Sequence, residues 1–391
     1  MSRSSIRALL VRLHRYVGLT IAGFLVVTGL TGAVIAFEKE VDGWLNPAMM
    51  RVAPDRPALS LNELVARIER ARPDLSVATI ELPEATGRSV RTFVTAPDGT
   101  PAAVNELFAD PATGTVLGTR LWGDIRLDRQ HIVPLLYAIH QDLHLPGEWG
   151  RWLLGGVALA WAFDCFVGFA LTLPLGRPFL RKWAPSWRIK HKAGSWRTMF
   201  DWHRASGLWL WPALLVVAVT SVSLNLYKEV FSPLLTRVLP VEWPMPGKQR
   251  LAGAWTGFDV AVACAHAEAR RIGRDAPVRQ VVRLDAKGMY RVKLRHADTA
   301  GAGPLIVHVA GDGCRSIAVA GAGTGASGDK VIDLMFPLHS GDAGGLAGRI
   351  LVCLTGLTVA GLSITGIWIW LRKRTGRLGR SGKGEVRLAR V

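Results

Sequence analysis

Four long apolar runs divide the chain, and shorter stretches of alternating apolar and polar residues lie between them. The runs span residues 19–37, 152–175, 208–227 and 350–371. Each is close to the 20 or so residues that a helix needs to cross about 30 Å of hydrocarbon, and a helix satisfies its own backbone hydrogen bonds in lipid. The pattern therefore predicts four transmembrane helices.

The two longest segments between these runs predict small mixed domains. In residues 38–148, Ser60 and Glu63 form a capping box at the start of a helix predicted over 60–68. Residues 228–346 repeat this order, with a helix predicted over 258–271. Strand-like runs follow the two helices, at 77–82, 89–96 and 103–108 in the first segment and at 278–284, 289–295, 305–309 and 315–319 in the second.

The second half of the chain thus repeats the plan of the first. A repeat of this kind predicts a pseudo-symmetric bundle in which equivalent positions meet near the axis. We predict a membrane α-helical fold, with four transmembrane helices in an internally duplicated bundle and two small α+β domains outside it. The predicted units are 1–37 (N-terminus and first span), 38–148 (first external domain and an interfacial helix), 149–175 (second span), 176–203 (basic loop), 204–227 (third span), 228–346 (second external domain), 347–371 (fourth span) and 372–391 (basic tail).

The formal charge of +18 is concentrated in three short segments. Residues 1–15, 174–204 and 371–391 hold 20 Lys and Arg against two acids, whereas the external segments are close to neutral. The positive-inside bias places these segments and both termini on the cytoplasmic side. No folded basic domain remains to bind nucleic acid, so that partner is excluded. The first apolar run is too long for a signal-peptide core, and we expect an uncleaved anchor.

Two pairs of histidines occupy equivalent places in the repeat. His14 and His203 each begin the pattern His-Arg-x-x-Gly-Leu at the start of an apolar run. His140 and His339 lie ten and nine residues before the Gly-Arg pairs that open the second and fourth spans. The first pair is predicted on the inner face of the bundle and the second on the outer face. Imidazoles from facing helices are suitable axial ligands for haem iron, so the four histidines predict two haem sites.

Other polar residues extend the candidate set. His144 stands one helical turn after His140 and is an alternative ligand of the outer haem. The arginines near the four histidines are candidate partners of haem propionates, with anchoring at the membrane interface as the alternative. They are Arg15, Arg204, Arg151 and Arg349. Asp164 is the only acid inside a span, and potential tuning, proton relay, a quinol contact and helix packing are its open roles. Cys264 and Cys314 are candidates for an external disulfide.

Together these motifs resemble the PepSY-associated transmembrane proteins, a family that includes iron-regulated ferrisiderophore reductases of the bacterial inner membrane. The resemblance covers nearly the whole chain and rests also on Thr365-Gly366-Ile367-Trp368 and on the two external domains. It implies a multi-pass inner-membrane protein with two b-type haems that passes electrons outward, reduces a ferric siderophore and releases Fe²⁺. Catalysis would then be electron transfer through haem, without a catalytic side chain.

Two other functions stay open at this point. One is a cytochrome b subunit that carries electrons to another external reductase, and the other is a binding or sensory protein whose histidines only anchor the interface. The inner-face segments, 31 residues at most, are too short for a flavin or nicotinamide domain. We therefore expect a separate cytoplasmic or quinol electron donor, membrane lipid around the bundle, and a ferric siderophore docked between residues 50–146 and 245–346.

Overall fold

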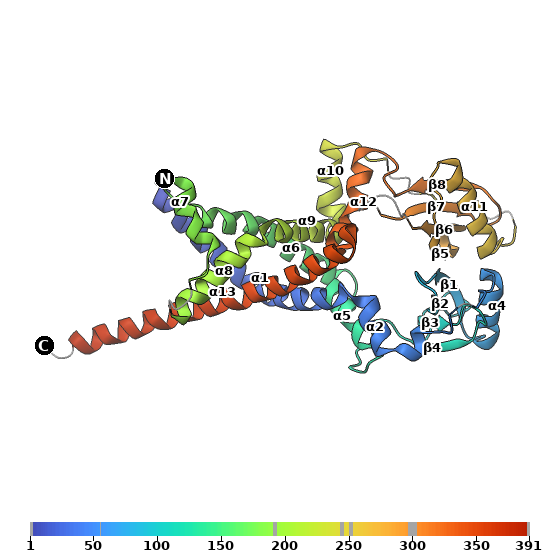
Figure 1. The fold of residues 1–391 in the computed structure, drawn as a ribbon, viewed down its shortest axis with the longest axis horizontal. Coiled ribbons are helices and arrows are strands. Elements are labelled where there is room, and N and C mark those ends of the chain that lie inside the picture. Colours follow the sequence, from blue (N-terminus) through green and yellow to red (C-terminus); the bar gives the residue numbers. More distant parts are fainter. Residues whose placement is uncertain are drawn as a thin grey trace.

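The computed structural model describes residues 3–54, 56–190, 194–242, 246–249, 253–295 and 303–388. It shows an elongated molecule in which a helical bundle carries a β-sheet at one end (Figure 1). Both ends of the chain lie at the opposite end of the bundle. We call these two ends the sheet end and the terminal end.

The bundle contains three helices that are long and apolar enough to cross a membrane. They are α1 (Arg3–Ile35), α6 (Trp149–Thr172) and α13 (Gly345–Leu388). A fourth crossing results if α8 (Ser195–Trp209) and α9 (Trp211–Asn225), which are bent by 68°, form one span. The chain is therefore an α-helical membrane protein, with three or four candidate spans among the residues that the structure describes.

The third span differs from its prediction as one straight helix over 204–227. The structure ends α8 at Trp209 and begins α9 at Trp211, and α8 takes in residues 195–203 of the predicted basic loop. Pro212 explains the break, because proline has no N–H to donate to the carbonyl of Leu208 and its ring clashes with the preceding turn. The bend turns α8 away from the axis of α9.

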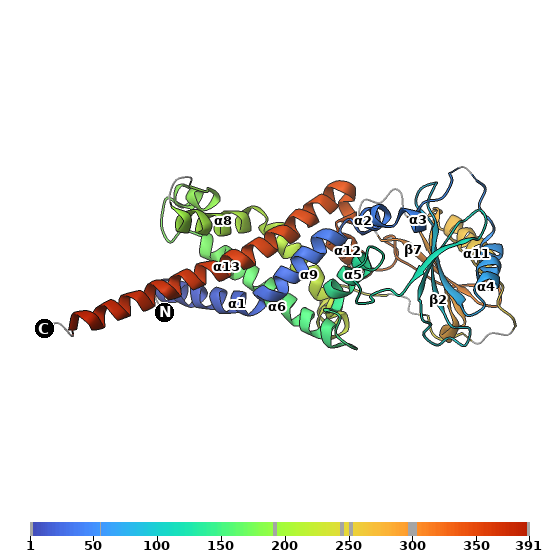
Figure 2. The same cartoon turned by 90° about the horizontal axis from the view of Figure 1, so that it is seen from below.

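Small residues mark the place where α1 and α13 cross. A Cβ atom built on Gly29 would lie 2.6 Å from the carbonyl oxygen of Gly356, and one built on Gly356 would lie 2.6 Å from that of Gly29. Ala33 and Ala360 follow one turn later on the two helices. Small residues let helix backbones approach closely in lipid, where packing and not a hydrophobic force drives association. The two views agree that α1 and α13 run side by side (Figures 1 and 2).

Within the part of the chain that the structure describes, eight strands form one antiparallel sheet in the order β4-β3-β2-β1-β5-β6-β7-β8. The strands are β1 (Ser76–Glu81), β2 (Val90–Thr95), β3 (Glu106–Ala109), β4 (Val116–Arg120), β5 (Val278–Leu284), β6 (Met289–Leu294), β7 (Leu305–Ala310) and β8 (Ser316–Ala320). The sequence predicts two small domains, but β1 pairs with β5 and joins the two halves into one sheet. Each of these strands would otherwise present an unpaired edge. The strands predicted from the sequence also did not include β4.

Two helices cover the sheet face that points away from the bundle, α4 (Leu61–Ala71) and α11 (Phe258–Arg271) (Figure 1). The hydroxyl of Ser60 accepts a hydrogen bond from the backbone N–H of Glu63 at 3.2 Å, as the capping box predicts. The two helix starts are joined, because Asp259 accepts hydrogen bonds from the backbone N–H groups of Leu61 and Asn62. A disulfide links Cys264 of α11 to Cys314. Apolar side chains from both halves form one core beneath the helices, among them Leu64, Ile68, Val77, Ile80, Val281, Tyr290, Val292 and Leu305.

A buried charge network fastens the first half of the sheet to the bundle. Arg120 of β4 is 1% exposed and donates to both carboxylate oxygens of Asp42, at 3.0 and 2.7 Å. Asp42 belongs to α2 (Glu38–Leu45), which follows α1 directly. Arg120 also contacts the buried carboxylate of Glu106 on β3 and donates to the carbonyl of Gln130. The network holds this half of the sheet in place above the bundle.

Short helices complete both ends of the bundle. At the sheet end, α5 (Ile132–Asp142) packs on α1 and α12 (Ser327–Ser340) packs on α9. The other short elements are α3 (Pro47–Met50), α7 (Phe179–Trp183), α10 (Ser232–Val238), a π-helical turn at Tyr227–Phe231 and 3₁₀ turns at Ala184–Trp187, Asp285–Lys287 and Asp342–Gly344. Both α5 and α12 carry a histidine that the repeat singled out.

Candidate functional site

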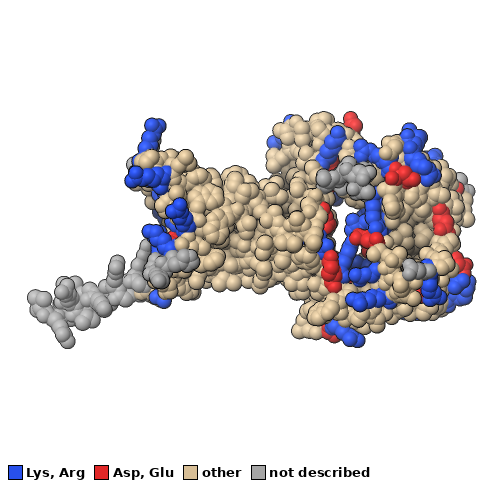
Figure 3. Space-filling model, viewed as in Figure 1, with Lys and Arg blue, Asp and Glu red and all other residues tan. Residues whose placement is uncertain are grey.

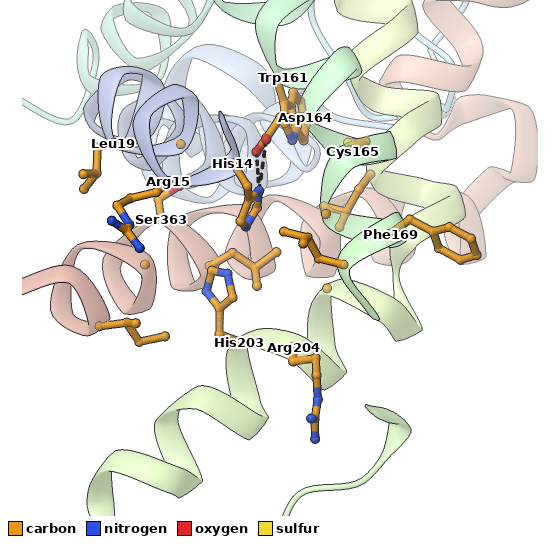
Figure 4. A pocket seen from close by; sticks show the side chains of 18 of the residues that line it. His14, Arg15, Leu19, Trp161, Asp164, Cys165, Phe169, His203, Arg204 and Ser363 are labelled. Atoms are coloured by element: carbon orange, nitrogen blue, oxygen red, sulfur yellow. Dashed lines mark hydrogen bonds and ion pairs between the residues drawn. The ribbon is translucent and has the colours of Figure 1, made fainter. Parts of the chain in front are cut away.

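One histidine pair, the inner pair, lies toward the terminal end between α1 and α8. The ring centroids of His14 and His203 are 6.1 Å apart, and the ring planes meet at 66°. Both side chains are half-buried and reach toward each other from opposite sides of one space (Figure 4). The structure thus brings together two residues that lie 189 positions apart in the sequence.

Both rings of the inner pair are held through Nδ1. That of His14 lies 2.9 and 3.0 Å from the two carboxylate oxygens of Asp164 in α6. That of His203 lies 2.9 Å from the hydroxyl of Thr365 in α13, which itself donates to the carbonyl of Gly361 at 2.7 Å. A carboxylate, and a hydroxyl whose proton is already used, can only accept, so each neutral ring carries its proton on Nδ1. The Nε2 atoms are left to bind a further ligand.

A cavity of about 440 Å³ surrounds the inner pair. Gly168 and Gly366 make room beside the rings, because a Cβ on either glycine would lie 3.5 Å from Cε1 of His14 or His203, respectively. Aromatic and aliphatic side chains form most of the remaining wall, including Trp161, Phe169, Trp211, Leu214 and Leu362. A mostly apolar pocket with a few polar groups, and a volume of roughly 300–1,000 Å³, is typical of cofactor and ligand sites.

The second histidine pair, the outer pair, lies at the sheet end between α5 and α12. The ring centroids of His140 and His339 are 6.2 Å apart, and the ring planes meet at 51°. Nδ1 of His140 lies 3.0 Å from the carbonyl oxygen of Thr28 and 3.1 Å from the hydroxyl of Thr31. Nδ1 of His339 lies 3.1 Å from the hydroxyl of Thr220. The outer rings are therefore anchored on α1 and α9 through the same nitrogen as the inner rings.

The two threonine anchors of the outer pair are equivalent in the repeat. Thr31 follows His14 by 17 residues, and Thr220 follows His203 by the same number. Each hydroxyl donates to the carbonyl four residues earlier in its own helix, at 2.8 Å. Each hydroxyl therefore accepts from the imidazole, which places the ring proton on Nδ1 and leaves Nε2 unprotonated.

The spacing within both pairs suits a single metal ion between two imidazoles. A metal–imidazole bond is about 2.0 Å long and the ring centre lies roughly 1 Å beyond the bonded nitrogen, so two opposed rings on one metal have centroids about 6 Å apart. The observed spacings are 6.1 and 6.2 Å. Among the described residues, no three His, Cys, Asp or Glu side chains gather as a metal site. Each pair could therefore supply two imidazole ligands to one bound metal centre.

The two pairs lie near opposite ends of the bundle. His14 and Thr31 mark them on α1, and the 17 residues between these positions correspond to a helical rise of roughly 26 Å. Apolar side chains from four helices pack between the pairs. They include Ile21, Leu25, Val157, Leu214 and Val359. The arrangement places one candidate cofactor site toward each face of a membrane.

Arg15 and Arg204 line the cavity around the inner pair, where the sequence predicts them. The guanidinium of Arg204 donates to Asp201 at 2.8 Å and to the carbonyl of Pro185 at 2.7 Å, and it lies away from the rings (Figure 4). Arg15 forms no ion pair with a described residue. Its charge is therefore available to an anionic group bound in the cavity.

Arg151 and Arg349, which the sequence predicts as partners of cofactor propionates, bind carboxylates of the protein in this structure. Arg151 donates to Glu229 at 2.8 Å and Arg349 donates to Glu40 at 2.5 Å. Glu40 and Glu229 are 189 residues apart, as are His14 and His203, so the two ion pairs are equivalent in the repeat. They join the start of α6 to the π-helical turn that follows α9, and the start of α13 to α2. The guanidinium groups of both arginines are thus paired with glutamates, and the two ion pairs connect helices at the sheet end of the bundle.

His144 does not face the outer pair. α5 ends at Asp142, and His144 is an exposed residue in the left-handed conformation with φ of 56°. Its Nε2 lies 2.5 Å from the carbonyl oxygen of Gly123. The helical spacing that would have placed it one turn beyond His140 is interrupted. Of the two candidates, the structure therefore brings His140 beside His339.

Sequence reasoning missed the hydroxyl anchors Thr31, Thr220 and Thr365. Thr31 and Thr220 have a recognisable signal, because they stand at the same place in the two repeats. Thr365 has none, because the inner pair departs from the symmetry by using one carboxylate and one hydroxyl. Asp164, whose role the sequence left open, contacts His14.

The fold and this site define an α-helical membrane protein with one sheet outside its bundle and two facing histidine pairs, one toward each end. The chain belongs to the family described as the PepSY-associated TM region, whose model matches residues 11–373. The match includes all four paired histidines and confirms the family that the sequence motifs suggested. A comparison with curated proteins finds no match.

Proposed function

We propose that the protein holds two b-type haems and passes electrons across the bacterial inner membrane to reduce a ferric siderophore. The observation that carries this proposal is the presence of two facing imidazole pairs, each with hydrogen-bonded Nδ1 atoms and with Nε2 left for a ligand. A haem with two imidazole ligands exchanges single electrons and has no open position for oxygen. His14 with His203, and His140 with His339, would hold the two groups.

The anchors of the two pairs differ in charge, and this difference supports outward electron flow. Asp164 is 7% exposed and places a carboxylate on the imidazole of His14. Hydroxyl or backbone carbonyl oxygens anchor His203, His140 and His339. A carboxylate on a ligand imidazole makes the ligand more basic and favours the more oxidised state of the metal. The inner site would then have the lower reduction potential, so transfer toward the outer site is downhill.

The terminal end is proposed to face the cytoplasm. Lys and Arg gather at this end in Figure 3, and cytoplasmic loops carry such an excess. The sheet then lies in an oxidising compartment, where the disulfide between Cys264 and Cys314 persists. A separate cytoplasmic protein or a membrane quinol would supply the electrons.

The ferric chelate is proposed to dock between the sheet and the bundle. The sequence predicts docking between the two external halves, and the pairing of β1 with β5 joins these halves into one sheet above the bundle. Figure 3 shows the molecule hollowed between the bundle and the sheet, with charged side chains around the hollow. α5 and α12, which carry the outer pair, lie at this end. One electron delivered there would convert Fe³⁺ to Fe²⁺, which hard oxygen donors hold more weakly.

The haem content of variants tests the two sites separately. We expect His203→Ala and His339→Ala each to retain about half of the wild-type haem-to-protein ratio, and the double variant to retain none. His144→Ala is the matched control and should keep both haems. Wild-type protein that lacks the absorption of a six-coordinate b-type haem after reduction would refute the proposal. A double variant that keeps both haems would refute the assignment of the ligands.

The reductase activity requires a second experiment. Dithionite-reduced protein, freed of excess reductant, is mixed anaerobically with a ferric hydroxamate and a chromogenic Fe²⁺ chelator. We expect the haem spectrum to become oxidised while trapped Fe²⁺ appears. If the haems stay reduced and no Fe²⁺ is trapped, the protein is an electron-carrier subunit for another reductase. A complete lack of haem would instead favour a binding or sensory protein.

A further inference from the structure

The sheet face that looks toward the bundle has a fixed arrangement of side chains. Strand pairing places one residue each from β2, β1, β5 and β6 in a row across this face: Arg91, Glu81, Gln280 and Lys293. In the neighbouring row, Arg291 of β6 stands directly opposite His308 of β7. The opposite face is the one that α4 and α11 cover. Charged residues from both halves of the chain therefore share the face above the hollow.

In the first half of the sheet, carboxylates of the protein balance the cations on this face. Arg120 binds Asp42 and Glu106, as described above. Arg91 contacts Glu106 as well, and one of its nitrogens lies 3.6 Å from both Glu38 and Glu81. This half of the face is a closed ion-pair network.

In the second half of the sheet, the basic side chains on this face are not paired with carboxylates of described residues. Within the described residues, no ion pair joins Arg291 or Lys293 to a carboxylate, and Nε of Arg291 and Nδ1 of His308 are buried without a hydrogen-bond partner. His308 is only 8% exposed. Burial, together with the charges of Arg291 and Lys287, lowers the pKa of His308 to about 4. Burial and the charges of Arg291 and Arg279 likewise lower the pKa of Lys293 to about 8. A buried donor without an acceptor is unusual in a folded protein and calls for a partner.

We propose that Arg291, Lys293 and His308, the sheet cation site, bind an anionic oxygen-donor ligand, and that this ligand is a carboxylate-bearing ferric chelate. The inference rests on the proposed function and adds the charge class of its substrate. A guanidinium presents paired N–H donors that match a carboxylate, and an ammonium group adds a compact positive charge. A carboxylate at Arg291 would also satisfy its buried Nε. The hollow in Figure 3 lies between the sheet and the end of the bundle that carries α5 and α12.

A chelate that cannot be reduced tests the sheet cation site without electron transfer. Full-length protein in lipid nanodiscs is titrated calorimetrically with gallium(III) citrate, with citrate alone and with a neutral gallium(III) trihydroxamate. We expect gallium citrate and citrate alone each to bind at least ~10-fold more tightly than the neutral trihydroxamate, and their affinities to fall with added salt. Combining Arg291→Gln with Lys293→Gln should weaken gallium citrate binding by at least ~10-fold.

Two further variants separate the loss of charge at this site from general effects. Arg270→Gln with Arg271→Gln removes the same charge from α11 on the other side of the sheet, where these side chains are 61% and 69% exposed. This control should bind within ~2-fold of the wild type, because exposed charges contribute little. Arg291→Lys with Lys293→Arg keeps the charge and one guanidinium, so it should bind gallium citrate more tightly than the double Gln variant, which shows that the sheet is intact.

The outcomes distinguish this inference from the proposed function. The sheet cation site is refuted if the Arg291→Gln, Lys293→Gln variant binds gallium citrate like the wild type, or if the neutral trihydroxamate binds as tightly as gallium citrate. If the protein reduces ferric chelates but gives either of these results, the proposed function stands and only the sheet cation site is refuted. Because gallium stays trivalent, a selective loss of binding in the variant supports the site even if the protein holds no haem.

Discussion

Asp164→Asn tests why the inner and outer sites would differ. Asp164 lies 2.9 Å from Nδ1 of His14 and is nearly buried, so its charge acts on a metal at Nε2 with little screening by water. Over a separation of roughly 6.5 Å and with an effective dielectric constant of about 20, one unit charge is worth ~2.5 kcal/mol. At ~59 mV for each tenfold change in a one-electron equilibrium, this corresponds to a potential on the order of 100 mV. Asparagine keeps the shape and an acceptor oxygen for Nδ1, so the substitution removes the charge alone.

The assay is a spectroelectrochemical titration of purified wild type and variant, fitted to two one-electron components. We expect the lower-potential component of Asp164→Asn to rise by on the order of 100 mV while the other component moves by less than ~20 mV. Thr365→Val is the matched control at the other inner ligand, because it removes a neutral anchor and should shift the potential much less. A lower component that stays in place or falls would refute the reasoning. An equal rise of both components would show that Asp164 does not act on the inner site selectively.

Three other perturbations test the outer site, the sheet anchor and the sheet cation site. Gly32→Val should remove the outer haem alone and lower the haem-to-protein ratio by about half, because a Cβ at Gly32 would lie 2.8 Å from Cε1 of His140. Gly23→Ala, at an exposed position of the same helix with nothing within 4 Å of the added Cβ, should keep both haems, and equal losses in the two variants would contradict this explanation. Arg120→Met should lower the free energy of unfolding by about 3–5 kcal/mol because it leaves Asp42 and Glu106 buried without a counter-charge, whereas the exposed Arg126→Met should cost less than about 1 kcal/mol. Thermal unfolding followed by the circular dichroism of the sheet distinguishes the two values. Lys293, with a pKa of about 8, is charged below that pH, so the affinity for gallium citrate should fall as the pH rises from about 7 to about 9. The groups that act on Lys293 are Arg291, Arg279 and Glu81; a pH-independent affinity in the wild type, or the same pH dependence in Lys293→Arg, would rule out Lys293 as the titrating group.

Local patterns predicted most of the elements. The helix over 258–271 and the strand over 278–284 have the predicted bounds, and Ser60 caps the start of α4 as predicted. These features depend on hydrogen bonds and apolar spacing between near neighbours in the chain, which a sequence displays directly. The bend at Leu210 also had a local cause in Pro212. The shared sheet had none, because the pairing of β1 with β5 joins strands about 200 residues apart and depends on how the two halves meet.

The candidate site divides in the same way. The sequence by itself determined the membrane class and the four paired histidines, because apolar length, charge bias and an internal repeat are properties of the order of residues. Tertiary structure decided that His140 faces His339, that Arg151 and Arg349 bind glutamates, and which oxygen holds each ring. The physical reason is that a hydrogen bond forms only within about 3 Å, and these partners come from helices that packing alone brings together. Asp164 and Thr365 show this most clearly, since two equivalent histidines of the repeat receive one charged and one neutral partner.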